Sequence, residues 1–404
     1  MAPEIVVTGM GVVSAIGLGK EAFIRALLEG EHAFRVMERP GRQKDSAHLG
    51  AELPPLGGGA QLDPHALRTA SLSSQAALAV LAEAWNDAAL GELEPARVGL
   101  LVGGSNFQQR ELSLMHDRYR QRPQFVRPTY AMSFMDTDLS ALCAAEFAIR
   151  GIVHTVGGAS ASGQLAIVQA IAAVSAGQVD ACIALGALTD LSHWELQALR
   201  SIGAMGSDRY ADQPSRACRP FDRVRDGFIF GESCGAVVIE RRTRARDSVR
   251  PYARLTGWTA AFDGNRNPDP SVEGESAAIR GAMQMAGYAP SDIDYINPHG
   301  TGSVRGDEVE VDAIRCCGLA GAHLNATKSL TGHGLAAAGT VEVIATLLQM
   351  RCGRLHPTRN LEDPLAPSLN WVRETAVEHS MEKALTLSFG FGGIYTALCI
   401  ERFH

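Results

Sequence analysis

The sequence predicts an α/β protein that is built as five layers, αβαβα, from two pseudo-repeated halves. Short β-branched runs alternate with longer alanine-rich runs along the 404 residues, which is the pattern of a layered α/β protein. Two helix-like segments, 160–174 and 331–348, are apolar on nearly every face, so both are expected to be buried. A charged break, RRTRARDSVR at 241–250, separates a first set of elements from a second, similar set.

The strands and helices are predicted from run length and residue type. In the first half, short β-branched runs predict the buried strands EIVVTGMGVV, RVGLLVGG, DACIALGAL and CGAVVIE. The longer runs QAALAVLAEAWNDAAL and LAIVQAIAAVSAGQ predict helices. After the break, similar elements recur as YARLTGWTAA, DIDYINPHG, AHLNATKS, LAAAGTVEVIATLLQM and ALTLSFGFGGIYTALCIE.

One local unit recurs in both halves. SASGQLAIVQAIAAV and TGHGLAAAGTVEVIATLL each suggest a strand, a turn with a polar residue, and an apolar helix of small residues. We therefore expect two halves related by a pseudo-twofold axis, residues 1–245 and residues 246–404.

Composition excludes several functional classes. Hydrophobic residues make up 46% and charged residues 20% of the chain, as in ordinary globular proteins. The net charge of −7 argues against general nucleic-acid binding. We find no apolar run of the roughly 18 residues that a membrane span needs, and the N-terminus lacks the basic region and cleavage site of a signal peptide. We expect a cytoplasmic protein that binds neither nucleic acid nor membrane.

The eight cysteines are scattered and form no C-x-x-C pair. Neither a zinc site nor a disulfide framework is indicated. We expect most of these cysteines to be small buried hydrophobes.

Four segments carry residues suited to chemistry. GGASASG (157–163) is a glycine turn that runs into a helix, where many enzymes place a nucleophile, and the candidate here is Ser160. YINPHGTGSVRGDEVE (295–310) presents His299 just after a strand. NATKSLTGHGLAAAG (325–339) contains Lys328 and, at an expected helix start, His333. LSFGFGG (387–393) is a glycine-rich turn after a strand.

A metal site is an alternative interpretation of the second segment. His299 is followed by three acidic residues, Asp307, Glu308 and Glu310. Hard oxygen ligands beside a single histidine make a poor zinc site. We therefore expect no metal.

Taken together, the four segments resemble the β-ketoacyl-ACP synthase family, which are thiolase-fold condensing enzymes, and most closely its elongating type. The resemblance runs almost from end to end: VVTGMGVVSAIG matches the opening strand and loop, and PSRACRPFDRVRDGFIFGESCGAVVIE (214–240) matches the central stretch. It implies a thiolase-like fold and a site with two active-site histidines and a lysine. By the same resemblance, substrate-binding and supporting residues surround them. The histidines and the lysine are His299, His333 and Lys328. The substrate-binding residues are Phe228, Phe391, Gly390 and Gly392, and the supporting residue is Glu310.

The sequence departs from that family at the nucleophile. The family places a cysteine in an A-C-A-S-G context, whereas residues 159–163 read A-S-A-S-G, with Ser160 in the cysteine's place. A cysteine thiolate accepts an acyl chain because its pKa, about 8.5 when free, falls at a helix N-terminus. A hydroxyl needs an adjacent general base. We expect acyl loading to be largely lost.

Decarboxylation of a malonyl thioester is expected to survive this change. It needs donors aimed at the thioester oxygen, where enolate charge develops, and an apolar wall beside the departing carboxylate. His299 and His333 can supply the donors, and a helix N-terminus is expected to keep His333 neutral. Phe228 lies along the carboxylate by family analogy. At the closing turn, Ile394 and Tyr395 replace the usual Thr-Asn, which suggests a reshaped or closed acyl pocket.

The resemblance therefore implies a malonyl-ACP decarboxylase that makes acetyl-ACP without condensation. Ketosynthase-like proteins with this cysteine-to-serine change belong to the β-branching cassettes of polyketide pathways, and TDLSHWELQALRSIGAMGS (189–207) is similar to that subgroup. One alternative is an acyltransferase that uses Ser160 as nucleophile. Another is a non-catalytic partner like a chain-length factor, although such a subunit has no chemical need for both histidines and the lysine.

The expected partners follow from the substrate. An acidic acyl carrier protein (ACP) would deliver malonate on its phosphopantetheine arm, and a basic patch would receive it; the candidates are Arg118, Arg120, Arg122 and Arg127. By resemblance we also expect a homodimer and functional partnership with an HMG-CoA-synthase-like enzyme. No cofactor of the chain's own is expected.

Overall fold

The strands of both halves join into one sheet in a computed structural model, which describes residues 4–56, 67, 70–243, 246 and 248–404. Over these residues the sheet has twelve strands. The first half contributes β1 (Ile5–Ser14), β2 (Gly17–Leu18), β5 (Val98–Gly103), β6 (Val153–Val156), β7 (Ala181–Gly186) and β9 (Ser233–Arg241). The second half contributes β10 (Ala253–Phe262), β11 (Tyr295–Asn297), β12 (His323–Leu324), β14 (Asn370–Trp371), β16 (Lys383–Gly390) and β17 (Ile394–Arg402).

The strand order repeats in the two halves. Outward from the centre, the first half runs β1-β9-β7-β5-β6 and the second runs β10-β17-β16-β11-β12, with β14 added beyond β12. Strands β1 and β10 pair antiparallel, with Val6 opposite Arg254, and this pairing joins the two half-sheets. The two pseudo-repeated halves are therefore confirmed. The boundary expected between 245 and 246 stays a prediction, because residues 244–245 lie outside the described residues.

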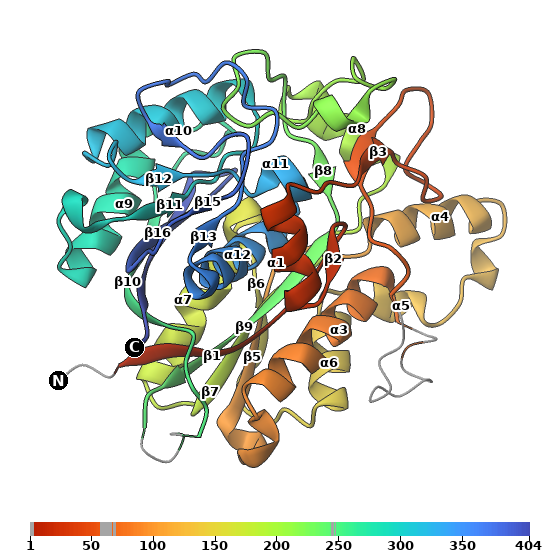
Figure 1. Cartoon of the computed structure of the whole chain (residues 1–404). Coiled ribbons are helices and arrows are strands. Elements are labelled where there is room, and N and C mark those ends of the chain that lie inside the picture. Colours follow the sequence, from red (N-terminus) through yellow and green to blue (C-terminus); the bar gives the residue numbers. More distant parts are fainter. Residues whose placement is uncertain (1–3, 57–66, 68–69, 244–245, 247) are drawn as a thin grey trace.

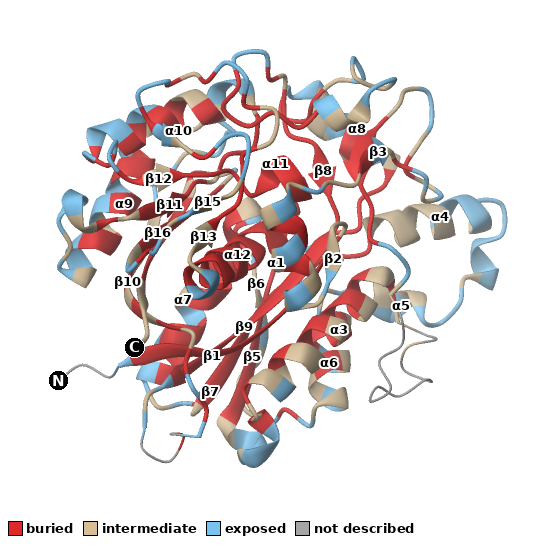
Figure 2. Ribbon diagram, in the orientation of Figure 1, coloured by how far each residue is buried: buried red, intermediate tan, exposed pale blue. Residues whose placement is uncertain are grey.

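Two buried helices fill the centre of the molecule. Helices α7 (Ser162–Ser175) and α12 (Ala338–Cys352) pack against each other and against strands of both halves. α12 is buried at every position from Ala338 to Met350, and both helices lie at the centre of Figures 1 and 2. This burial explains why neither helix has a polar face.

One expectation about apolar runs was wrong. The segment Leu335–Cys352 is 18 residues long with a mean hydropathy of 1.3, so it is long and apolar enough to span a membrane. However, 83% of this segment is buried inside the protein. Its hydropathy is that of a core helix between two half-sheets.

Outer helices complete the five layers. α3 (Leu72–Asp87) and α6 (Thr137–Glu146) cover the first half-sheet, and α9 (Val272–Ala286) and α10 (Val304–Cys316) cover the second (Figure 1). The sequence patterns had not indicated α9 and α10. Both begin at serine N-caps, since Ser271 and Ser303 accept hydrogen bonds from backbone amides in the first turn.

Shorter elements surround the layers. A three-stranded sheet, β3-β4-β8, and a two-stranded one, β13-β15, lie apart from the main sheet. Their bounds are β3 (Phe34–Val36), β4 (Leu49–Ala51), β8 (Phe230–Gly231), β13 (Arg354–Leu355) and β15 (Val377–Glu378). The other α-helices among the described residues are α1 (Lys20–Glu29), α4 (Gln109–Tyr119), α5 (Tyr130–Ser133), α8 (His193–Ser201) and α11 (Lys328–Thr331).

Candidate active site

Ser160 lies in a strained turn at the start of α7. The turn is a short 3-10 segment, Ala159–Ala161, and Ala159 has a φ of +47°, a left-handed conformation that costs energy for a residue other than glycine. The Ser162 hydroxyl holds the turn by accepting from Gly158 N (2.8 Å) and donating to Ala159 O (2.7 Å). The pseudo-repeat has the same design, because Leu335 (φ +51°) begins the 3-10 segment before α12.

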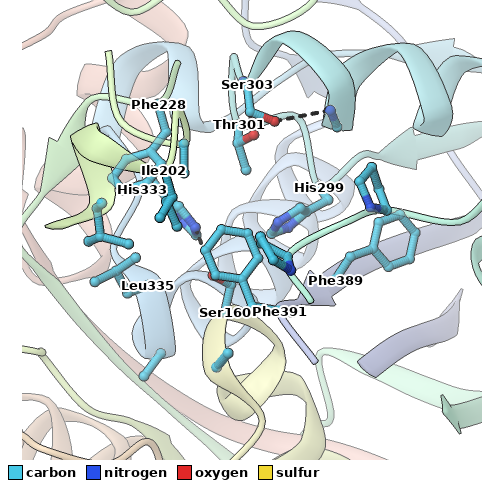
Figure 3. Close-up of a pocket in the computed structure, with 18 of the residues that line it drawn as sticks. Ser160, Ile202, Phe228, His299, Thr301, Ser303, His333, Leu335, Phe389 and Phe391 are labelled. Carbon is cyan, nitrogen blue, oxygen red and sulfur yellow. Dashed lines mark hydrogen bonds between the residues drawn. The ribbon is translucent and has the colours of Figure 1, made fainter. Parts of the chain in front are cut away.

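His333 comes from the other half of the chain and contacts Ser160. Its Nε2 lies 2.9 Å from Ser160 Oγ (Figure 3). Backbone hydrogen bonds to the β8 region fix its position, from His333 N to Ile229 O and from Gly231 N to His333 O. The Nδ1 atom of His333 is buried and has no hydrogen-bond partner among the described residues.

Both histidines are held in the neutral form. Burial, followed by the positive charge of Lys328, keeps the pKa of His333 well below its ordinary value. Burial, Lys328 and His333 do the same to the pKa of His299. The expected cause at His333 was a helix N-terminus, but α12 begins only at Ala338. Burial and a neighbouring cation are the actual causes.

Lys328 links the His299 loop to the central helix α12. Its Nζ donates to the carbonyl oxygen of His299, lies 3.5 Å from His299 Nδ1, and pairs with Glu342 Oε1 at 2.5 Å. Lys328 and Glu342 are both fully buried. Since Lys328 can donate to Nδ1, the ring proton of His299 is expected on Nε2.

The carboxylates near His299 hold the loop. Glu310 accepts from the backbone amides of His299 (2.5 Å) and Gly300 (2.8 Å), and Asp307 accepts from those of Phe221 and Gly302. Burial raises the pKa of Glu310 to about 8 although these amides oppose the shift. Among the described residues, no group of three or more His, Cys, Asp or Glu side chains could hold a metal ion.

Aromatic side chains form walls of the site. The buried ring of Phe228 packs edge-on against His333, with ring centroids 5.1 Å apart. Phe391 is 42% exposed in the turn between β16 and β17 and also lines the cavity (Figure 3). Gly390 allows this turn to approach the Ser160 turn, because a Cβ there would lie 2.4 Å from Gly158 O. Gly392 has a φ of +89°, which favours glycine.

One cavity of about 750 Å³ collects these residues. The residues that line it include Ser160, Phe228, His299, His333, Gly390 and Phe391. Gly392 does not line it, and Lys328 contacts His299. Several lining or supporting residues were not found from sequence, namely Phe389, Leu335, Ile202, Glu275, Ser388 and Glu342. Glu342 could have been found from the sequence, since it is an acidic residue inside an otherwise apolar helix. No sequence pattern indicated Ser388, although its hydroxyl donates to the carbonyl oxygen of Ser160 at 3.1 Å.

No thiol is available at this site. All eight cysteines lie in the described part of the chain, and none of them lines the cavity. The thiol of Cys218 donates to the backbone carbonyl oxygen of Lys328, and burial raises the pKa of this thiol to about 12. A thiolate nucleophile is therefore missing.

The layered fold and this site define a ketosynthase-type enzyme with a serine in the nucleophile turn. Sequence comparison agrees: residues 2–245 match the family model "Beta-ketoacyl synthase, N-terminal domain", and residues 252–362 match "Beta-ketoacyl synthase, C-terminal domain". The chain belongs to the β-ketoacyl synthase family.

Two curated relatives and one solved structure illustrate the likeness. The chain is 57% identical over 401 residues to the polyketide biosynthesis malonyl-ACP decarboxylase PksF of Bacillus subtilis, covering 99% of this chain and 97% of the relative. It is 31% identical to 3-oxoacyl-[acyl-carrier-protein] synthase 1 of Haemophilus influenzae, with 99% of both chains covered. A β-ketoacyl synthase structure from Burkholderia phymatum superposes with a TM-score of 0.89 at 26% identity, and all of both chains is covered. The thiolase-like fold is thus confirmed.

Proposed function

We propose that this chain decarboxylates malonyl-ACP to acetyl-ACP without condensation and supplies acetyl units for β-branching in polyketide biosynthesis. The observation that carries the proposal is that two neutral imidazoles converge on one cavity beside a serine, with no thiol present. The 57% identity to a malonyl-ACP decarboxylase over nearly the whole chain supports it. The substrate is carried on the phosphopantetheine of the ACP, and the chain contributes no cofactor of its own.

His299 and His333 donate to the thioester oxygen of malonate. As the carboxylate leaves as CO2, negative charge develops on that oxygen, and preorganised donors stabilise it without a further reorganisation cost. Each donor of this kind typically lowers the barrier by about 2.7–4 kcal/mol. Neutral imidazoles suit this role because each carries one N–H, and the pKa shifts keep both rings neutral.

Phe228 provides the apolar wall. Its buried ring lies against His333, so a carboxylate next to it would lose hydration. Desolvation favours conversion of the charged carboxylate to neutral CO2. Phe391, Gly390 and Gly392 belong to the turn that approaches the Ser160 turn, and we assign them to substrate binding. Lys328 orients His299, and Glu310 supports the His299 loop.

Ser160 occupies the nucleophile position without accepting an acyl chain. Its hydroxyl keeps this position polar and lies 2.9 Å from His333 Nε2, whose N–H turns to the thioester oxygen when malonyl-ACP binds. With no acyl group loaded, the enolate has no electrophile except a proton, and acetyl-ACP is the product.

Intact-protein mass spectrometry of malonyl-ACP incubated with the enzyme tests this function. We expect malonyl-ACP to lose the mass of CO2 while the enzyme shows no adduct. Unchanged malonyl-ACP would contradict the proposal and point to a non-catalytic subunit that needs a partner.

The contact between Ser160 and His333 supports a second candidate, an acyltransferase that forms an acyl-serine. The 2.9 Å distance between Oγ and Nε2 is that of a nucleophile and its base. Against it, His333 Nδ1 has no partner among the described residues, so no third group orients the imidazole as in a triad. An acyl mass increase on Ser160 would favour this candidate.

We also propose a homodimer that receives ACP and works with an HMG-CoA-synthase-like enzyme. Strand β6 lies at one end of the sheet order, where the sheet of a second copy could continue it, and Phe125, Met132 and Phe134 are exposed. Arg118, Arg120, Arg122 and Arg127 are all exposed, as an ACP-docking patch requires. The cysteines are free, as is usual in the cytoplasm.

A further inference from the structure

One step of the proposed decarboxylation, the protonation of the enolate, has not yet been assigned to a residue. When the bond between C2 and the carboxylate carbon of malonate breaks, the electron pair stays on C2 and spreads to the thioester oxygen. This enolate becomes an acetyl group only when C2 takes up a proton. His299 and His333 are engaged at the oxygen, so their N–H groups are not free to protonate C2. The site therefore needs a separate acid.

Glu275 is a buried carboxyl group that lines the same cavity. It lies in the first turn of α9, its residue is 1% exposed, and it borders the cavity together with Ser160, His299 and His333. Its Oε2 atom is buried and has no hydrogen-bond partner among the described residues. Tyr395 packs against the same turn, since a Cβ on Gly274 would lie 2.4 Å from its ring.

Glu275 differs from the two other buried acids nearby in what surrounds it. Burial also raises the pKa of Glu310 and of Asp307, but both oxygens of each accept backbone N–H groups, so these two acids are engaged in holding the loop. The Oε2 atom of Glu275, by contrast, accepts no hydrogen bond from the described residues. Burial, followed by the charges of Glu310 and Asp307, raises the pKa of Glu275 well above its ordinary value. Such surroundings favour the protonated form of a carboxyl group.

We propose that Glu275 is the proton donor to C2 of the enolate, directly or through one water molecule. The C2–carboxylate bond breaks and CO2 leaves. A C2–H bond then forms with the proton of the Glu275 carboxyl group. The resulting carboxylate of Glu275 takes up a proton from solvent through the cavity. The sum is one malonyl thioester and one proton converted to one acetyl thioester and CO2.

Ser160 is a poorer candidate for this step. Its hydroxyl is hydrogen-bonded to His333, and loss of its proton would leave an alkoxide. A carboxylic acid is a stronger acid than an alcohol or water, so it transfers its proton to carbon more readily.

The isotope content of the product tests this proposal, which rests on the proposed decarboxylation. Malonyl-ACP is converted in an equal mixture of H2O and D2O, and mass spectrometry measures the ratio of CH3 to CH2D in acetyl-ACP. That ratio reports which group delivers the proton. Malonyl-ACP remaining in each sample corrects for exchange before decarboxylation. The variants are Glu275→Gln, Glu275→Ala and the control Glu195→Gln; Glu195 lines the same cavity, and glutamine preserves its capping box at α8.

We expect Glu195→Gln to give the same CH3 to CH2D ratio as wild type. Both Glu275 variants should give a different ratio, the same in each, because water then protonates C2. KM is expected to stay unchanged. An unchanged ratio in folded Glu275→Gln and Glu275→Ala would overturn the proposal while acetyl-ACP formation leaves the proposed function intact. Complete loss of CO2 release in both folded variants would overturn it as well, because removing a proton donor leaves bond cleavage possible. Failure of the wild-type enzyme to form acetyl-ACP would instead overturn the proposed function.

Discussion

Ser160 Oγ lies 2.9 Å from His333 Nε2, although 173 residues separate the two in the chain. The serine comes from the start of α7 in one half and the histidine from the loop before α12 in the other. A polar group thus fills the nucleophile position and bonds to an imidazole, while the other nitrogen of that imidazole has no partner among the described residues.

Replacing Ser160 by cysteine is expected to restore acyl loading. The thiol would lie at the N-terminus of the 14-residue helix α7, which lowers a thiol pKa and favours the thiolate. Incubation of Ser160→Cys with acyl-ACP should give an acyl adduct by intact-protein mass spectrometry, and wild type should give none. Ser160→Ala is the matched control, with no adduct and a decarboxylation rate within about tenfold of wild type, a difference of about 1.4 kcal/mol. An adduct on wild type would contradict this assignment.

The two histidines are expected to contribute separately to kcat. His299→Ala and His333→Ala should each lower kcat for decarboxylation by about 10²–10³-fold, because each removes one donor to the developing negative charge. His404→Ala, at the exposed C-terminus, is the control and should leave kcat unchanged. Rates are measured as acetyl-ACP formed from malonyl-ACP. A loss below about tenfold at either site would show that the imidazole does not stabilise the enolate.

Removing one partner of the Lys328–Glu342 ion pair is expected to destabilise the folded protein strongly. Both side chains are fully buried, so Glu342→Leu or Lys328→Met alone leaves a buried charge uncompensated and should cost about 3–5 kcal/mol of unfolding free energy. The double variant should lose less than the sum of the two single variants. Urea titrations of all four proteins measure this. Additive losses would mean that the pair is not coupled.

The kcat for decarboxylation is expected to stay unchanged in mild acid. The pKa of both histidines is held well below its ordinary value by burial and by Lys328, so each imidazole becomes charged only at a lower pH than a free histidine. We therefore expect kcat to stay constant from about pH 7.5 to about pH 5.5, across the ordinary histidine pKa of about 6.5. Lys328→Met removes a positive charge and should shift the acid limb to higher pH. A wild-type acid limb centred near pH 6.5 would be incompatible with neutral, buried imidazoles.

Much of the fold could be predicted because run length and residue type are local properties. The strands β1, β5, β7 and β9 and the helices α3 and α7 lie where β-branched or alanine-rich runs predict them. Helices α9 and α10 were missed, since their apolar residues are interspersed with charges, although the serine caps at 271 and 303 were available as signals. The small sheet β3-β4-β8 had no such pattern, because its strands are two or three residues long.

The sequence by itself determined the type of chemistry, because it places a hydroxyl where the family has a thiol and retains two histidines and a lysine. These are properties of single side chains. Only the tertiary structure decided that Ser160, His299 and His333 face one cavity, that burial and Lys328 lower the pKa of both imidazoles, and that Glu275 lines the same cavity. The physical reason is that distance and desolvation depend on packing between the halves of the chain, and pKa values follow from both.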